Sequence, residues 1–357
     1  GEVAESISHA TPEPTPAAAP AARAPAPEVP GATTARSSLP GPRLPDFTDP
    51  ANDPVPAPAA APGETARRLR ATTLALRRQE RESAALRVTA AGGDPDAVEI
   101  LAETPAYAGA VPNVTVCMAL FEQPEEVAEA LESVAVQDLD DVDVIIHDDA
   151  SRDDSAAVVA AFLGERPWLP ARLVRRVVNG GLPRARNTML RTARAPLTLM
   201  LDADNAIYPQ AARRLRAALE GDAGAMFAYG ALAIHRDGLP DGLLSAGAWD
   251  PAILRERNPV DALSLLRRAP VLALGGYCED DRLHGWEDYE LWVRIAAAGG
   301  RGVLANGYIG RYRRAGGSML ALSDLDADGM RELLRELHPH VMDGPAQPES
   351  GLHWTAR

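Results

Sequence analysis

The sequence predicts an α/β fold with a mostly parallel central sheet flanked by helices. From residue 112 onward, short apolar runs alternate with segments of helical periodicity. Connections of this length form right-handed crossovers, which join parallel strands. Hydrophobic residues make up 46% of the 357 residues, which is enough for a sizeable core. Sheets of this kind bind ligands at the carboxyl ends of their strands, so the site is expected there.

The elements are expected in a regular order along the chain. Buried-strand runs are predicted at 114–121, 142–147, 172–178 and 196–201. Helices are predicted at 124–137, 155–164, 183–193, 208–221 and, near the C-terminus, 327–338. The segment 208–221 has proline in its expected first turn and glycine at its end, the usual punctuation of a helix.

The flanking segments differ sharply in composition from the main domain, which is expected at 112–320. Residues 1–63 hold 15 of the 31 prolines, so we expect a disordered Pro/Ala-rich tail that buries too little apolar surface to fold. Residues 64–92 form a basic helical segment. It either contacts an anionic membrane or a protein partner, or packs on the main domain, as its thin apolar stripe favours. A C-terminal helix and tail are expected at 321–357.

Composition excludes several classes of function. The chain has 50 acidic and 36 basic residues and a formal net charge of −14, which argues against a nucleic-acid-binding protein. Every basic residue is arginine, so chemistry that needs a lysine is excluded, such as Schiff-base catalysis or a Walker A site. Cys117 and Cys278 cannot form a disulfide framework. With no apolar span or signal peptide in the sequence, we expect a cytoplasmic protein, with peripheral contact at the inner membrane face left open.

Acidic clusters follow two of the predicted strands. The run HDDASRDD covers 147–154, and DADN covers 202–205. Acids after a strand are often turn formers or helix caps, and most of those in the first run fit that role. Asp202 and Asp204 follow six nearly unbroken apolar residues, and their alternate positions direct both carboxylates to one side. Two such oxygen ligands suit Mg²⁺ or Mn²⁺ carrying a diphosphate.

A series of blocks in a fixed order resembles the family 2 glycosyltransferases, which have a GT-A fold. These blocks are VTVCMALFEQ, VDVIIHDDASRDDS, NGGLPRARNTML, LTLMLDADN, NPVDALSLLRR, GWEDYELWVRIAAAGG and RYRRAGGSML. The resemblance implies an inverting, metal-dependent enzyme that uses a nucleotide-diphospho-sugar, with a UDP-sugar as the favoured donor and Mn²⁺ or Mg²⁺ as cofactor. The acceptor would be a carbohydrate, a lipid-linked molecule or a small molecule. The QxxRW signature of processive synthases is absent, which favours transfer of a single sugar.

The resemblance also implies roles for individual residues. Asp288 would be the catalytic base, with Glu287 as the second choice, although both would also suit the first turn of a helix. The residues implied in nucleotide-sugar binding are Asp149, Ser151, Gly181, Arg186, Asp202, Asp204, Trp286 and Arg313, and Asp204 and Asp202 would also hold the metal. Two of these keep a structural alternative, since Trp286 either stacks on a sugar or lies in the core, and Arg313 either neutralises diphosphate or lies on an exposed strand.

Two departures from the family pattern are visible. The loop after the first strand reads Ala119-Leu120-Phe121-Glu122 where many relatives read Pro-Thr-Tyr-Asn, and 308–314 has no histidine where many relatives have a metal ligand. The main alternative function is a non-catalytic nucleotide-sugar-binding or scaffolding domain. A pyrophosphorylase and a haloacid-dehalogenase-like phosphatase fit less well, because both would need a lysine.

Overall fold

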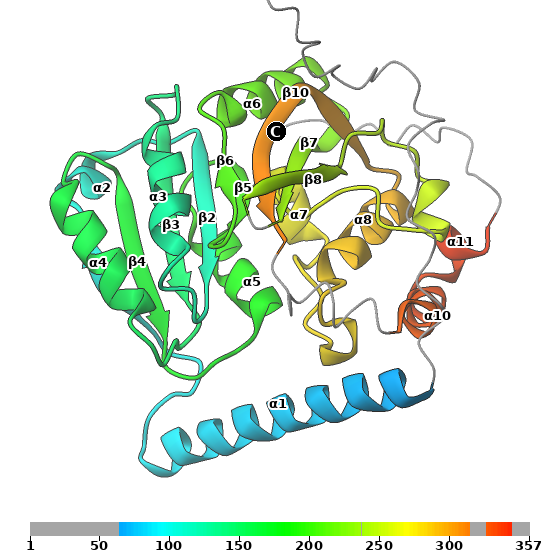
Figure 1. Cartoon of the computed structure of the whole chain (residues 1–357), viewed down its shortest axis with the longest axis horizontal. Helices are drawn as coiled ribbons and strands as arrows, with labels where there is room; N and C mark the ends of the chain where they lie inside the picture. The colour runs from blue at the N-terminus through cyan, green and yellow to red at the C-terminus, as the bar shows by residue number, and fades with distance from the viewer. Residues whose placement is uncertain (1–63, 237, 315–325, 345–357) are drawn as a thin grey trace, which may run out of the picture. The chain divides into compact units, whose positions relative to one another are not determined.

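A computed structural model describes residues 64–236, 238–314 and 326–344 (Figure 1). The strands are β1 (Val98–Glu103), β2 (Val114–Leu120), β3 (Val142–Asp148), β4 (Ala171–Arg176), β5 (Leu197–Asp202), β6 (Ala206–Ile207), β7 (Ala225–Arg236), β8 (Leu239–Leu244), β9 (Leu265–Arg267) and β10 (Arg301–Arg313). The α-helices are α1 (Glu64–Ala90), α2 (Pro105–Gly109), α3 (Val127–Ala135), α4 (Ser155–Glu165), α5 (Leu182–Thr192), α6 (Ala211–Gly221), α7 (Arg268–Ala273), α8 (Glu287–Ala297), α10 (Ala327–Leu337) and α11 (Pro339–Met342). Two short 3₁₀ turns are η1 (Ile253–Arg255) and η2 (Asp281–Leu283). The tail expected at 1–63 lies outside the described residues.

The strands form one sheet in the order β1-β4-β3-β2-β5-β9-β7-β10-β6, with β8 paired to β7. Strands β4, β3, β2 and β5 are parallel, as predicted. Strand β9 runs antiparallel between β5 and β7, and β1 is antiparallel to β4, so the complete sheet is mixed. The predicted α/β class, a central sheet flanked by helices, is confirmed. Because Leu120 is paired with Asp148 and Ala119 with Asp202, the ends of β2, β3 and β5 meet at one edge.

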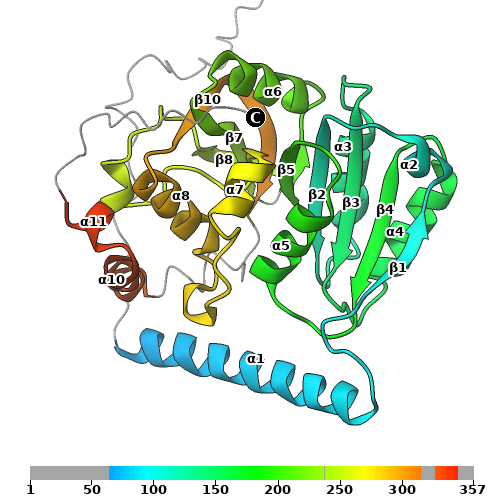
Figure 2. The ribbon, with the colours of Figure 1, turned by 180° about the vertical axis from the view of Figure 1, so that it is seen from behind.

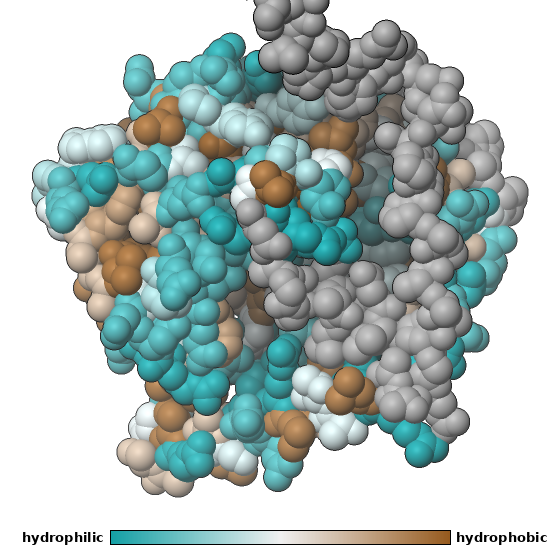
Figure 3. Space-filling view, viewed as in Figure 1, coloured by the Kyte–Doolittle hydropathy of each residue, from teal (hydrophilic) through white to brown (hydrophobic). Residues whose placement is uncertain are grey.

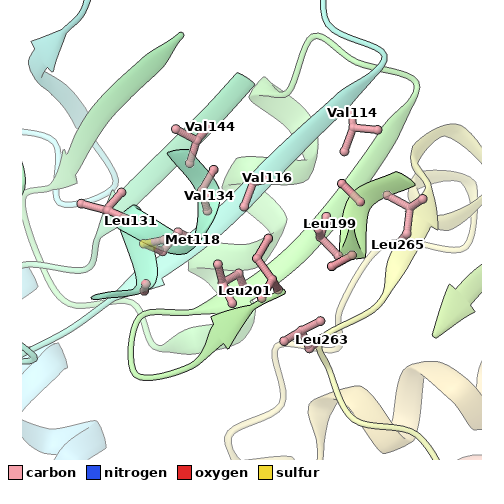
Figure 4. Close-up of a cluster of buried hydrophobic side chains, with 14 of the residues drawn as sticks. Val114, Val116, Met118, Leu131, Val134, Val144, Leu199, Leu201, Leu263 and Leu265 are labelled. Carbon is pink, nitrogen blue, oxygen red and sulfur yellow. The ribbon is translucent and has the colours of Figure 1, made fainter. Parts of the chain in front are cut away.

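Alternating side chains of the central strands pack into two cores on opposite faces of the sheet. On one face, Val116 and Met118 of β2 pack with residues of α3, α4 and α6. Figure 4 shows the two residues together with Leu131 and Val134 of α3. On the other face, Cys117 and Ala119 pack with residues of α5, α8 and α10. Figure 2 shows the same ribbon from behind. Helices therefore cover both faces, which explains why these strands read as nearly continuous apolar runs.

Two predicted boundaries differ from the structure. Helix α6 begins at Ala211, so the proline at 209 precedes the helix instead of lying in its first turn. The reason is that β6 pairs with β10 and the amide of Tyr208 donates to the carbonyl of Ile309, which keeps this stretch extended. The sheet also begins before the expected domain start at 112, since β1 is its edge strand. Across the three described ranges, no helix is long and apolar enough to cross a bilayer.

Candidate active site

Carboxylates from separate parts of the chain meet near the carboxyl edge of the sheet. Asp202 ends β5 and Asp204 follows it, Asp261 lies shortly before β9, and Asp288 lies in the first turn of α8. Asp261 is electrostatically coupled to Asp202, and Asp288 is coupled to Asp261. The phenol of Tyr312 on β10 is coupled to all four carboxylates, which raise its pKa together with burial, the larger cause. We call Asp202, Asp204, Asp261 and Asp288 the acidic cluster.

A buried arginine joins the two halves of this site. Arg186 of α5 is 2% exposed. Its Nη2 donates to Oδ1 of Asp202 at 2.8 Å, and its Nη1 donates to Oε1 of Glu287 at 3.2 Å. Burial opposes the charge of Arg186, but Asp202, Tyr277 and Glu287 together keep its pKa above the ordinary value. The end of β5 and the start of α8 are thus linked through one guanidinium, which explains an arginine inside the core.

The neighbouring acids of α8 have different environments. Glu287 is 3% exposed, and its two oxygens accept hydrogen bonds from Arg186 and from the amide of Gly285. Asp288 is only half-buried, and its oxygens accept from the amide of Tyr289 at 2.7 Å and the side chain of Asn258 at 2.9 Å. Burial, with the charge of Glu287, raises the pKa of Asp288 to about 7. Asp288 is therefore the more accessible carboxylate and titrates near neutrality.

The pair predicted to bind a metal, Asp202 and Asp204, belongs to the acidic cluster. Burial, together with the charges of Asp202 and Asp261, raises the pKa of Asp204 to about 7. Asp202 already accepts a hydrogen bond from Arg186. Within the described part of the chain, no group of three or more histidine, cysteine, aspartate or glutamate side chains is arranged to hold a metal ion. The donors present here are two carboxylates in a region of excess negative charge.

Asp149 and Ser151 hold the loops beside this edge in place. The Asp149 carboxylate accepts the amides of Gly180 and Gly181 at 2.8 and 2.7 Å, while burial raises its pKa. Ser151 Oγ accepts the amide of Glu122 at 3.0 Å. Gly181 has φ +86° and ψ 160°, a conformation that is essentially restricted to glycine. These residues fix the turns after β2 and β3 and the start of α5.

The remaining predicted site residues, Trp286 and Arg313, both contact neighbouring parts of the fold. Trp286 is 9% exposed and packs on Tyr289 with ring centroids 5.0 Å apart, so it lies in the core. The Arg313 side chain forms an ion pair with Glu129, and its Nε donates to the backbone oxygen of Asp204 at 3.2 Å. Arg313 is thus partly buried against the loop that carries the acidic pair.

Sequence reasoning missed Asp261 and Tyr312. Burial raises the pKa of Asp261 to about 6, and the amide of Leu263 donates to its Oδ1 at 2.9 Å. Both residues lie inside blocks that carried the family resemblance, NPVDALSLLRR and RYRRAGGSML. The available signal was that Asp261 is the only acidic residue of the first block and Tyr312 the only aromatic residue of the second.

A family model and two curated proteins are similar to this chain in sequence. The family model described as glycosyl transferase family 2 matches residues 115–263. The succinoglycan biosynthesis protein ExoO of Rhizobium meliloti (strain 1021) is 29% identical over 234 residues, which are 61% of this chain and 66% of that protein. The glycosyltransferase EpsE of Bacillus subtilis (strain 168), itself described as putative, is 26% identical over 196 residues, covering 54% of this chain and 69% of EpsE.

Two solved structures also resemble the chain. TarS 1–349 of S. aureus in complex with UDP-GlcNAc has a TM-score of 0.49 and 18% identity, over 58% of this chain and 60% of that one. The mannosyltransferase PcManGT of Pyrobaculum calidifontis, in complex with GDP-Man and Mn²⁺, has a TM-score of 0.47 and 19% identity, over 78% and 84%. The match to ExoO thus spans just under two thirds of that protein, and the match to TarS spans 60% of the fragment 1–349.

Proposed function

The chain belongs to glycosyltransferase family 2, and on that premise we propose that it transfers one sugar from a nucleotide-diphospho-sugar to an acceptor hydroxyl with inversion. The favoured donor is a UDP-sugar. The observation that carries the proposal is the Arg186 bridge, in which one guanidinium binds both Asp202 and Glu287, the residue before Asp288. A donor site around Asp202 and Asp204 would thereby adjoin a base at Asp288.

Asp288 is the proposed general base. It accepts the proton of the acceptor hydroxyl while that oxygen attacks the anomeric carbon on the face opposite the leaving diphosphate. A base works best when its pKa lies near the working pH, and burial brings the pKa of Asp288 to about 7. The side chain of Asn258 and the amide of Tyr289 hold the carboxylate through hydrogen bonds of 2.9 and 2.7 Å. Because the carboxylate is already oriented, it loses little rotational freedom in the reaction. Glu287 is held by Arg186 and Gly285, so its proposed part is to position this turn.

The acidic pair is proposed to hold a divalent cation. The donor set fits Mn²⁺ or Mg²⁺, since both prefer carboxylate oxygens and complete their shells with water and phosphate oxygens. The charges around Asp204 also fit, because Asp202 and Asp261 leave a local negative excess that a cation would offset. When bound, such an ion would stabilise negative charge on the leaving diphosphate. Arg313 would add a second positive charge there by leaving Glu129.

The nucleotide is proposed to lie against the turns fixed by Asp149. Gly181 permits close approach of the backbone, and its conformation depends on the two amides that Asp149 accepts. Ser151 supports the turn after β2 through the Glu122 amide. The buried position of Trp286 favours a core role, so sugar stacking is not part of the proposal.

A panel of donors tests this function against a non-catalytic binding domain. The protein is incubated with Mn²⁺, a series of UDP- and GDP-sugars and a mixture of acceptors, and released nucleoside diphosphate is measured. We expect release with at least one donor, abolished by EDTA. The control variant Glu256→Gln, which changes an exposed acid near Asn258, should act like the wild type. Binding of a donor without release from any member of the panel would instead support the non-catalytic function.

A further inference from the structure

Helix α1 contacts the segment that leads into the proposed base. In Figure 1 the helix runs along the lower side of the molecule, and its described contacts include η2. Arg70 is 7% exposed on a helix whose side chains are mostly exposed. Its Nη2 donates to the backbone carbonyls of Arg282 and His284, at 3.1 Å each. Burial lowers the pKa of Arg70, a cost of desolvation that the contacts with these carbonyls must offset.

Further arginines of α1 contact the same segment. Arg81 Nη2 lies 2.6 Å from Asp281 Oδ1, and Arg78 Nε lies 3.5 Å from Asp281 Oδ2. Arg77 Nη1 lies 2.8 Å from Nε2 of His284. Burial and the nearby arginines lower the pKa of His284 to about 4, so its ring is neutral at pH 7 and accepts the hydrogen from Arg77. The basic character of the helix is therefore used largely within the molecule.

One peptide group connects Arg70 to the site. The carbonyl of His284 accepts from Arg70, and the amide of the next residue, Gly285, donates to Glu287 Oε2 at 2.8 Å. The other oxygen of Glu287 binds Arg186. The His284–Gly285 peptide is thus held between Arg70 and Glu287, and hydrogen bonds at both ends of a peptide strengthen each other.

The outer face of α1 does not carry a continuous apolar stripe. Leu69, Leu76 and Leu86 are exposed, and Figure 3 shows hydrophobic residues separated by hydrophilic ones along the bottom of the molecule. Near its other end, Arg81 also approaches the turn fixed by Asp149, since a Cβ built on Gly181 would lie 3.0 Å from Nη1 of Arg81. The contacts of α1 are therefore concentrated on the face turned toward the site.

We propose that α1 is a positioning element of the active site, and that Arg70 is its positioning residue. Arg70 acts through the His284–Gly285 peptide and Glu287, which together set the place of Asp288. The inference rests on the proposed function, because it assigns α1 a part in placing the general base.

The test compares Arg70→Ala, the conservative Arg70→Lys and the control Arg87→Ala, which removes an exposed arginine from the last turn of the same helix. Hydrogen exchange is measured over peptides covering 282–289 and over β2 and β3, and kcat and KM are measured with the donor that the panel identifies. For Arg70→Ala we expect about tenfold faster exchange at 282–289, unchanged exchange in β2 and β3, about tenfold lower kcat and a donor KM within twofold. Arg70→Lys should recover most of kcat, because an ammonium can still donate to both carbonyls.

Several results would overturn the inference. The inference fails if Arg70→Ala shows the same exchange at 282–289 and the same kcat as the control Arg87→Ala. It also fails if Arg70→Ala loses protection from exchange throughout the sheet, because Arg70 would then stabilise the whole fold. If Arg70→Ala fails to fold, Arg77→Ala gives the same readouts with the loss of a single hydrogen bond. If the wild type transfers no sugar, the proposed function fails. The exchange at 282–289 still decides whether α1 positions this segment.

Discussion

Replacing Asp288 with asparagine should change turnover and stability in opposite directions. The substitution removes the proposed proton acceptor while keeping the volume of the side chain. General bases contribute about 10²–10⁴-fold to rate, so we expect kcat to fall by that factor while donor binding persists. Because the pKa of Asp288 is raised in the folded state, removing its charge should stabilise the fold at alkaline pH.

The magnitude follows from the pKa of Asp288. Its shift from 3.8 to about 7 corresponds to ~4 kcal/mol of penalty on the folded state above pH 7. The sign is set by the raised pKa, since the penalty is absent below the unfolded value of 3.8, grows between pH 3.8 and about 7, and is fully present above the folded value. Against this gain, the carboxamide has one acceptor oxygen for two donors, Asn258 and the Tyr289 amide, which costs about 1–3 kcal/mol. The net expectation at pH 8 is a gain of about 1–3 kcal/mol.

Urea unfolding at pH 8 and pH 4 measures the difference in unfolding free energy between the variant and the wild type at each pH. At pH 4 the wild-type carboxyl is largely neutral, so the variant should lose its advantage and become equal or less stable. Donor binding by calorimetry confirms that the site is intact. A variant that is less stable at pH 8, or that keeps wild-type turnover, would refute the reasoning and move the base elsewhere.

Three further predictions concern the same site. Asp204→Ala should weaken Mn²⁺-dependent binding of nucleoside diphosphate at least tenfold by calorimetry, whereas the exposed control Glu165→Gln should not; equal binding would contradict the metal assignment. The kcat should fall as pH drops through about 7, because Asp288 becomes protonated, and a kcat constant from pH 5 to 8 would exclude it as base. Gly181→Ala should cost about 1–3 kcal/mol in urea unfolding, because its φ of +86° and ψ of 160° suit glycine alone. The helical control Gly164→Ala, where an added Cβ meets nothing within 4 Å, should be neutral or stabilising.

The parallel half of the sheet could be predicted because both of its faces are covered. Strands β2, β3, β4 and β5 lie within one residue or two of the predicted ranges, since their apolar runs have sharp ends. Strand β7 was not predicted, and of β10 only the end around Arg313 was considered as a strand, for a physical reason. Strand β7 reads AMFAYGALAIHR, whose small residues fit a helix or a strand, and β10 reads RGVLANGYIGRYR, whose glycines interrupt any period.

The chemical identity of the site was more predictable than its connections. Asp202, Asp204, Glu287 and Asp288 were named from their blocks, but periodicity contains no information about Arg186 binding two of them. The contacts of Arg70 could not be predicted either, because its partners are backbone carbonyls, which every sequence offers. Long-range pairing of this kind depends on the tertiary fold alone.

The anomeric configuration of the product tests the central claim most directly. Using the donor identified by the panel, the linkage formed in the first minutes is determined by proton NMR. Direct displacement assisted by Asp288 predicts that an α-linked donor gives a β-linked product. A product that retains the donor's configuration would contradict the account, because it would require a different arrangement of nucleophile and base around the same carboxylates.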